Sequence, residues 1–178
     1  MKCTFNLNSS LLGLDGSLVR FDKKVDHIKI NPSDVNKIYR NHEVAVHTKT
    51  HPNLTQLSED EIIDQVENDR LNLSSLCGYE VVGMAYPCGG VNNDDRVAQI
   101  IKNKTGVKYS RTITSTNSFE QQNNLLRFNP TVYHIDFDDM VSLGKTFIDL
   151  NSDSPKVFYI WGHSYEFYIN NNLHLNIY

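Results

Sequence analysis

The chain has 178 residues, of which 39% are hydrophobic and 21% are charged, and its formal net charge is −4. This length and composition predict one soluble globular domain over residues 1–178 with a sizeable core. The acidic balance argues against nucleic-acid or anionic-membrane binding, which usually shows as a basic face. No stretch of about 20 apolar residues is present, so no membrane span is expected.

The N-terminus and the cysteines argue against two further classes. The opening MKCTFNLNSS has no long apolar region, so it is not a signal peptide, and the chain as it stands is expected to be cytoplasmic. Cys3, Cys77 and Cys88 are odd in number and form no CxxC motif, which argues against a disulfide framework or a cysteine zinc knuckle. Each cysteine is predicted to be a small buried apolar residue.

The first half of the chain predicts two strands and a long helix. Cys3–Leu7 and Val44–Val46 are short apolar runs typical of strands. Ser58 followed three residues later by Glu61 is a capping box, which satisfies free amides at a helix start. Apolar residues then recur at helical spacing, and Gly78 supplies a typical helix end, so a helix is expected over 59–77.

The second half continues the alternation, with a polar, irregular segment over 111–131. Strand–helix–strand repetition with connections of this length predicts parallel strands. Functional groups gather at the C-terminal ends of such strands, and His47, Tyr86 and His163 all fall there. The further elements expected are strands at Tyr79–Tyr86, Val107–Tyr109 and Val157–Trp161, and helices at Asp94–Lys104 and Asp138–Leu150.

Residues 44–53, VAVHTKTHPN, contain two histidines four positions apart. A single helical turn would bring His47 and His51 to the same side, where two imidazoles can bind one divalent metal. The alternative is a pair of surface histidines on a loop. The surrounding motifs favour the metal site.

Three ordered motifs resemble those of the NodB-like polysaccharide deacetylases. HTKTHP over 47–52 resembles the family's metal-binding motif, and GMAYPCGG over 83–90 resembles its third motif. WGHSYEF over 161–167 is similar to the last motif in the form used by one bacterial branch. The opening CTFNLN is similar to the family's second strand, so the resemblance covers essentially the whole chain.

The resemblance implies an α/β fold, a distorted (β/α) barrel, and removal of acetyl groups from N-acetyl sugars or acetylated xylans with one divalent metal. His47 and His51 would be metal ligands. Zinc is the metal expected first, and cobalt, nickel or manganese are the alternatives. His163 would be the general acid, and the backbone amide of Cys88 the oxyanion donor. These groups suit a hydrolase, which must activate water, stabilise an oxyanion and protonate the leaving group.

Four further residues are candidates for binding the carbohydrate substrate. Trp161 would form part of the wall of the acetyl pocket. The alternative is that Trp161 is simply buried in the core. Tyr86, like Cys88, would be pocket wall or core, and Tyr165 and Glu166 would line the sugar groove or pack the final loop. Histidines outside the motifs are interpreted as surface or structural residues, namely His27, His42, His134 and His174.

One family motif is absent. The first motif, a Thr/Ser-Phe-Asp-Asp-Gly segment on the first barrel strand, supplies the base and the third ligand, and this chain begins after that strand should have ended. Asp94-Asp95 and Asp138-Asp139 look like helix starts instead. Many members also have arginine where this chain has Ala85. Two histidines are fewer than the three protein ligands usual for catalytic zinc.

The missing strand leaves the expected sheet with an exposed edge, and dimerisation across that edge is a hypothesis. Either the recorded chain is N-terminally short, in which case a lost segment could direct export, or the first strand is truly absent. The main hypothesis is a metal-dependent carbohydrate deacetylase. The alternatives are a catalytically inactive carbohydrate-binding relative and a structural or regulatory remnant.

Overall fold

The computed structural model describes residues 2–169, which group into two compact units. The first unit holds the residues up to Asp15, Ile28–Thr112 and Asn124–Phe128. The second holds Gly16–His27, Ile113–Asn123 and the described residues from Asn129 onward. The single domain over 1–178 stays a prediction. Within the described part of the chain, no helix has the length and apolar character needed to cross a membrane.

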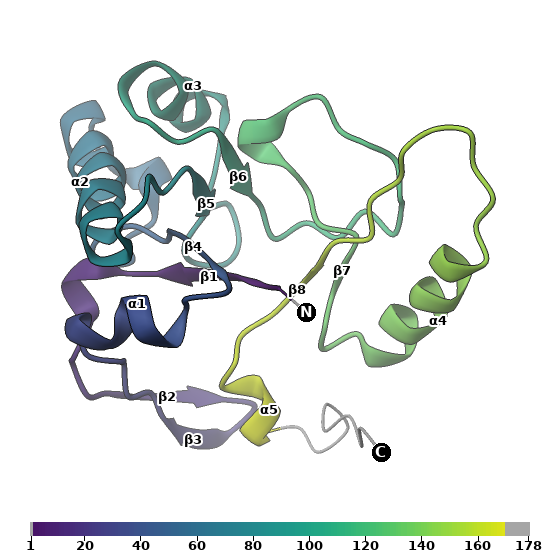
Figure 1. Cartoon of the computed structure of the whole chain (residues 1–178), viewed down its shortest axis with the longest axis horizontal. Helices are drawn as coiled ribbons and strands as arrows, with labels where there is room; N and C mark the ends of the chain where they lie inside the picture. Colours follow the sequence, from purple (N-terminus) through teal and green to yellow (C-terminus); the bar gives the residue numbers. More distant parts are fainter. Residues whose placement is uncertain (1, 170–178) are drawn as a thin grey trace. The chain divides into compact units, whose positions relative to one another are not determined.

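A parallel sheet of four strands forms the centre of the first unit (Figure 1). Its order is β1-β4-β5-β6, which confirms the expected α/β fold with parallel strands, while closure into a barrel stays a prediction. Among the described strands, β1 pairs only with β4, and dimerisation across its other edge also stays a prediction. The strands are β1 (Thr4–Leu7), β4 (Glu43–Val46), β5 (Gly83–Ala85) and β6 (Tyr109–Arg111).

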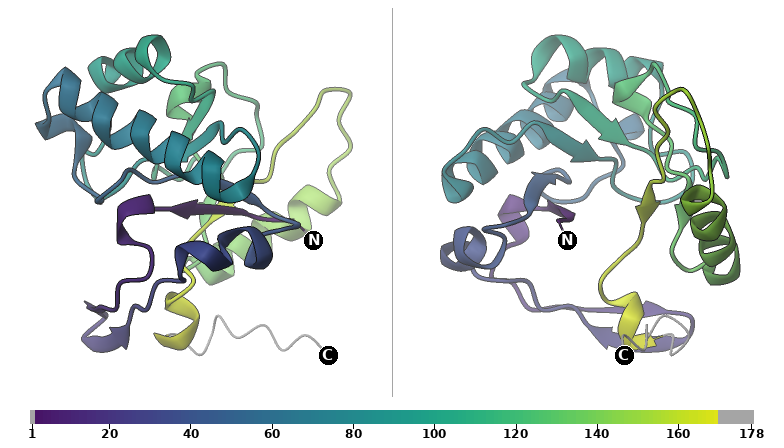
Figure 2. Two further views of the ribbon diagram at one scale, coloured as in Figure 1. Left: turned by 60° about the vertical axis from the view of Figure 1, so that its left-hand side comes forward. Right: turned by 45° about the vertical axis from the view of Figure 1, so that its right-hand side comes forward.

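Helices α2 (Glu59–Cys77) and α3 (Asp95–Lys104) lie side by side and pack against this sheet (Figure 2). The predicted capping box is present at the start of α2, and Gly78 ends the helix with φ +77°. The carboxylate of Asp94 accepts a hydrogen bond from the amide of Val97 and so caps α3. The helices share a core with the strands through Val44, Val46, Ile62, Val66, Leu73, Met84, Val97 and Ile101.

Short helical segments that the sequence analysis did not predict connect these elements. They have no more than one turn, so they carry too few residues for a periodic pattern. In the first unit they are η1 (Ser9–Leu11), η2 (Pro32–Asp34), α1 (Val35–Ile38), η3 (Leu54–Gln56) and η4 (Leu125–Arg127).

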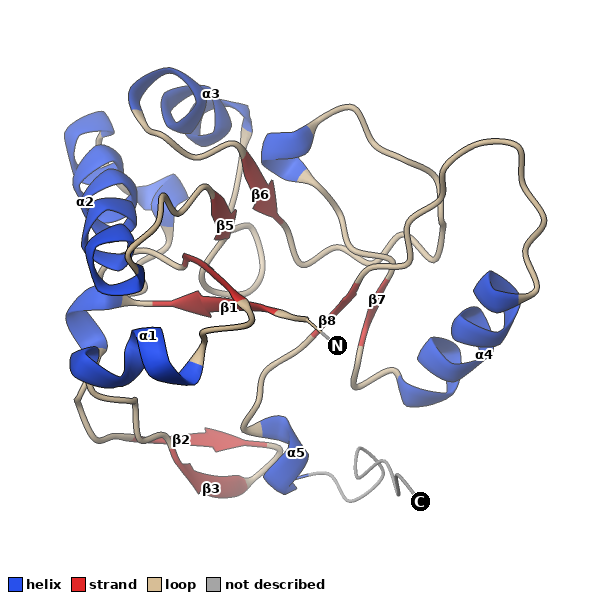
Figure 3. Cartoon of the chain, viewed as in Figure 1, coloured by secondary structure: helices blue, strands red, loops and turns tan. Residues whose placement is uncertain are grey.

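The second unit contains a hairpin, a parallel strand pair, two helices and long loops, drawn in tan in Figure 3. The hairpin of β2 (Ser17–Arg20) and β3 (Lys23–Asp26) turns at Phe21 and Asp22, both with positive φ. This turn type usually carries Asn-Gly or Asp-Gly, and Phe-Asp does not match that preference, so the hairpin was not predicted. The remaining elements are β7 (Val132–Tyr133), α4 (Phe137–Ile148), β8 (Ile160–Trp161) and α5 (Glu166–Ile169).

Three predicted strands differ from the structure in their bounds. The strand expected at Tyr79–Tyr86 is reduced to β5, since the amide of Val81 donates to the hydroxyl of Ser74 on α2. The strand expected at Val107–Tyr109 is displaced to β6. The strand expected at Val157–Trp161 is reduced to β8, since the amide of Val157 donates to the carbonyl of Phe119.

The cysteine prediction holds for only one of the three. All three thiols are free, and Cys77 is buried as expected. Cys3 is exposed just before the first residue of the edge strand β1, so the prediction was wrong there. Cys88 is half-buried.

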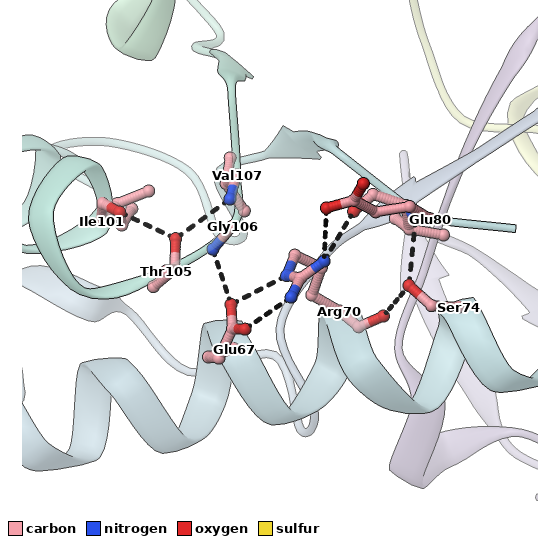
Figure 4. Close-up of polar contacts among 9 residues, drawn as sticks. Glu67, Arg70, Ser74, Glu80, Ile101, Thr105, Gly106 and Val107 are labelled. Carbon is pink, nitrogen blue, oxygen red and sulfur yellow. Dashed lines mark hydrogen bonds and ion pairs between the residues drawn. The ribbon is translucent and has the colours of Figure 1, made fainter.

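An ion pair between the buried Arg70 and the half-buried Glu67, both on α2, meets the loop that follows α3 at Gly106 (Figure 4). The guanidinium of Arg70 donates to the carboxylate of Glu67 at 2.6 and 2.8 Å, and it also contacts Glu80. The amide of Gly106 donates to the same Glu67 carboxylate at 2.8 Å. Gly106 lies so close to Arg70 that a Cβ atom at position 106 would be 2.4 Å from the guanidinium carbon.

Gly106→Ala is therefore expected to lower the free energy of unfolding by about 1–3 kcal/mol, the usual cost of overpacking. Urea unfolding measures the change. Gly89→Ala is the matched control, because a Cβ there would meet no atom within 4 Å, and a change within about 0.5 kcal/mol is expected. Equal stability of the two variants would contradict the tight packing of Arg70 on Gly106.

Candidate functional site

A bent loop after β4, rather than a helical turn, brings His47 and His51 together. Thr48 and His51 adopt left-handed backbone angles, with φ of +69° and +66°, which non-glycine residues rarely do. The amide of His51 donates to the hydroxyl of Thr48 at 3.0 Å and closes the loop. The two imidazole centroids are 4.9 Å apart and the ring planes are inclined at 70°. Such backbone strain is typical of functional loops.

The ring of His47 is oriented by the strand beside it. Its Nδ1 lies 2.8 Å from the carbonyl oxygen of Ala85 on β5. Because a carbonyl only accepts hydrogen bonds, Nδ1 carries a hydrogen, and in the neutral ring Nε2 then carries the lone pair. A metal-ligating histidine is usually held this way, with its other ring nitrogen donating to a carbonyl or carboxylate.

Two polar side chains hold the backbone of His47. The side-chain amide Nδ2 of Asn8 donates to the backbone carbonyls of His47 and Thr48 at 2.6 and 2.9 Å. The carboxylate of Asp69 on α2 accepts from the amides of His47 and Ser9 at 3.1 and 2.7 Å. Sequence reasoning missed Asp69, although a signal was present. It occupies a core position of α2, in register with the buried Ile62, Val66 and Leu73.

Asp69 is fully buried, and burial raises the pKa of its carboxyl to about 6, despite hydrogen bonds from the Ser9 and His47 amides that lower it. The folded chain therefore binds this proton more tightly than the unfolded chain. The contribution of Asp69 to stability falls as pH rises from about 4 to about 6, and is constant above that.

Comparing the wild type with Asp69→Asn isolates this effect. The difference in unfolding free energy, wild type minus variant, is expected to decrease by up to about 3 kcal/mol between about pH 4 and pH 7. Asp64→Asn is the control, because hydrogen bonds from Lys49 and Asn68 lower the pKa of Asp64, so its contribution to stability changes only below about pH 4 and the corresponding difference should stay nearly constant between about pH 4 and pH 7. A difference independent of pH would contradict the assignment. Urea unfolding at a series of pH values provides the measurement.

The loop after β5 carries Tyr86 and Cys88. Tyr86 is 1% exposed, lies in the core of the first unit and donates its hydroxyl to the carbonyl of Leu126 at 2.7 Å. This is the packing alternative that the sequence left open. Cys88 has a left-handed backbone angle, φ +69°. Its thiol lies 3.5 Å from the carbonyl oxygen of His51 and 3.9 Å from the Nδ1 atom of the His51 ring. Burial raises the pKa of this thiol, which favours its neutral form.

The residues of the last motif gather in the second unit. His163 follows β8, and its Nδ1 lies 3.1 Å from a carboxylate oxygen of Glu166. Tyr165 stacks on the His163 ring, with centroids 5.0 Å apart and planes inclined at 19°. Trp161 is half-buried and stacks on Tyr133 with a centroid distance of 4.1 Å. The structure thus brings together Trp161, His163, Tyr165 and Glu166, whereas His47, His51 and Cys88 belong to the first unit.

Glu166 is fully buried, so its carboxylate serves internal contacts, the packing alternative left open for it. Its main partner is His134, whose Nε2 donates to it at 2.7 Å. Burial alone would raise the pKa of Glu166, but hydrogen bonds from His134, His163 and Tyr133 hold it well below its usual range. Sequence reasoning placed His134 among surface or structural histidines, and no local pattern marked its partnership. His174 lies outside the described residues.

Comparison with known proteins decides the family. A family model described as Polysaccharide deacetylase matches residues 21–110, about half of the chain. The chain belongs to the polysaccharide deacetylase family. The search of curated proteins found no match.

Solved structures of deacetylases share the fold. The Streptococcus pyogenes deacetylase PplD in complex with acetate matches with a TM-score of 0.58 and 20% identity, covering 72% of this chain and 51% of that chain. BC0361, a polysaccharide deacetylase from Bacillus cereus, matches with a TM-score of 0.54 and 17% identity, covering 71% and 35%. The chain therefore spans about half the length of PplD and a third of BC0361.

The family implies a divalent metal, and the described residues fit it in part. The His47 ring presents an Nε2 lone pair, and the His51 ring lies beside it, as two ligands of one ion require. No group of three or more His, Cys, Asp or Glu side chains suited to a metal occurs between residues 2 and 169. The donor set is thus smaller than the three protein ligands usual for catalytic zinc.

Proposed function

We propose that this chain is a metal-dependent hydrolase that removes acetyl groups from a carbohydrate, by N- or O-deacetylation. The proposal rests on family membership together with one observation, the orientation of His47. The carbonyl of Ala85 selects the tautomer whose Nε2 can ligate a metal, beside a second imidazole on the same strained loop. A surface histidine needs neither arrangement.

Each residue has a proposed task. His47 and His51 hold one divalent ion, zinc first, and such an ion supplies Lewis-acid activation of the carbonyl and of water. The backbone amide of Cys88 donates to the oxyanion, and a donor so placed is worth a factor of about 10² to 10³. His163 gives a proton to the leaving nitrogen or oxygen as its bond to the acetyl carbon breaks. Trp161 and Tyr165 contribute aromatic surface to the sugar site.

A second candidate is a catalytically inactive carbohydrate-binding relative. It is favoured by the incomplete ligand set, since the described residues offer two histidines without a third ligand or an assigned base. Such a protein would bind an acetylated sugar and leave it intact.

Acetate release from N- and O-acetylated oligosaccharides, measured with metal-free protein and after addition of Zn²⁺ or Co²⁺, tests the proposal. Release that depends on added metal is the expected result. Sugar binding by calorimetry without release, under all metal conditions, would replace the proposal with the binding relative. Binding of neither metal nor sugar would indicate a structural or regulatory remnant.

A further inference from the structure

One carboxylate in the second unit is shared by two histidines. Glu166 opens α5 and is fully buried, although it lies between the exposed Ser164 and Phe167. One of its oxygens, Oε2, accepts from Nε2 of His134 at 2.7 Å and lies 3.1 Å from Nδ1 of His163. The backbone amide of His163 donates to the same oxygen at 3.0 Å.

The other oxygen, Oε1, is held from two further elements. The hydroxyl of Tyr133 on β7 donates to it, and Nε of Arg20 on β2 lies 3.4 Å away. Burial and the neighbouring Glu166 charge raise the pKa of Tyr133, so the phenol stays neutral and remains a donor. The carboxylate is therefore surrounded by hydrogen-bond donors from β7, His134 and the last motif, with the charge of Arg20 on β2 beside it. Such a group cannot rotate without losing several hydrogen bonds at once.

The surroundings also fix the ring of His163. Tyr165 stacks on one side, and Trp161 meets the ring edge-on with a centroid distance of 5.6 Å. The side chain is still 38% exposed, so the ring is held at Nδ1 and remains accessible. Because Nδ1 faces a carboxylate, Nδ1 carries a hydrogen. Nε2 is therefore the ring nitrogen that would exchange a proton with a substrate.

The glycine of the last motif explains how His134 fits beside this carboxylate. A Cβ at position 162 would lie 2.4 Å from the His134 ring. The His134 ring therefore packs directly on the backbone of Gly162, one residue before His163. A histidine outside every motif is thus built into the same cluster as the motif residues.

We propose that Glu166 is a positioning residue that sets the ring of His163, and that His134 acts through Glu166 by holding the carboxylate in place. The proposal rests on the proposed role of His163 as general acid. In that role His163 starts as the imidazolium, the Nε2 proton goes to the leaving nitrogen or oxygen, and the neutral ring keeps its Nδ1 hydrogen toward Glu166.

Long-range ¹H–¹⁵N NMR correlations of the full chain report the tautomer of each histidine and need no activity. The wild type is expected to show neutral His163 as the Nδ1–H tautomer at a pH where the ring is deprotonated. Glu166→Gln should convert a measurable fraction to Nε2–H, because an amide at position 166 can present a donor to Nδ1. Glu120→Gln is the control, since Glu120 is an exposed carboxylate of the same unit, paired with Lys156. An unchanged His163 tautomer in a folded Glu166→Gln variant would overturn the proposal.

A second pair of variants keeps the test decisive if Glu166→Gln does not fold. In His134→Gln the side-chain amide can still donate to Glu166, whereas in His134→Leu it cannot. Acetate release should fall at least about ten-fold in kcat for the leucine variant, with KM little changed, and should recover in the glutamine variant. Equal kcat in the two folded variants would overturn the role of His134. A wild type that releases no acetate would overturn the proposed function, while the tautomer measurement would still decide the positioning role.

Discussion

His47→Ala is expected to lose divalent metal binding. In the proposal the imidazole is one of two histidine ligands among the described residues, and its Nδ1 already faces the carbonyl of Ala85. Removing a partner that merely orients a metal ligand typically weakens metal affinity by about 10- to 100-fold. Loss of the ligand itself should therefore weaken binding by more than about 100-fold. Calorimetric titration with Zn²⁺ or Co²⁺, and metal analysis of dialysed protein, give the affinity and the stoichiometry.

His42→Ala is the matched control for this experiment. His42 belongs to the same unit and lies outside the motifs, where its Nδ1 accepts a hydrogen bond from the amide of Cys3. Its loss should leave metal affinity unchanged, while His51→Ala should behave like His47→Ala. If His47→Ala bound one metal as tightly as the wild type, the assignment of the two histidines would be wrong.

His163→Ala is expected to lower acetate release by about 10² to 10⁴-fold, the usual contribution of a general acid. The loss should be in kcat, because without the imidazole the leaving nitrogen or oxygen departs without a proton. Metal affinity should be unchanged, since the contacts of His163 are with Tyr133, Trp161, Tyr165 and Glu166 in the second unit. Initial rates of acetate release and metal titration of the same preparation measure both quantities.

This pattern separates the tasks of the histidines. His47→Ala loses metal and activity together, whereas His163→Ala loses activity alone. A His163→Ala variant with wild-type kcat would remove the general acid from the proposal. A variant that lost metal as well would place His163 among the ligands instead.

Much of the first unit could be predicted from local signals. The capping box at Ser58 and Glu61 and the glycine at position 78 placed helix α2 correctly over 59–77. The strand preceding His47 was also predicted, because a short apolar run followed by polar residues is readable without tertiary contacts. The hairpin of β2 and β3 was missed, since its turn at Phe21 and Asp22 uses residues without the usual turn preference.

The motif residues were visible in the sequence, but their surroundings were not. The sequence pointed to the His47/His51 pair and to His163, and it left packing and binding open for Tyr86 and Glu166. The structure places both of these side chains in buried positions with hydrogen-bond partners. Local spacing cannot distinguish a buried polar group from an exposed one, because the distinction depends on what folds over it.

The sequence by itself determined the parallel α/β class, the family motifs and the residue types available for chemistry. Only the tertiary structure decided which distant side chains hold the motif residues in place. Asp69 reaches the amide of Ser9 across 60 positions of the chain, and Glu166 reaches His134 across 32. The physical reason is that periodicity and capping are local properties of the chain, whereas a buried carboxylate is stable only when distant donors converge on it.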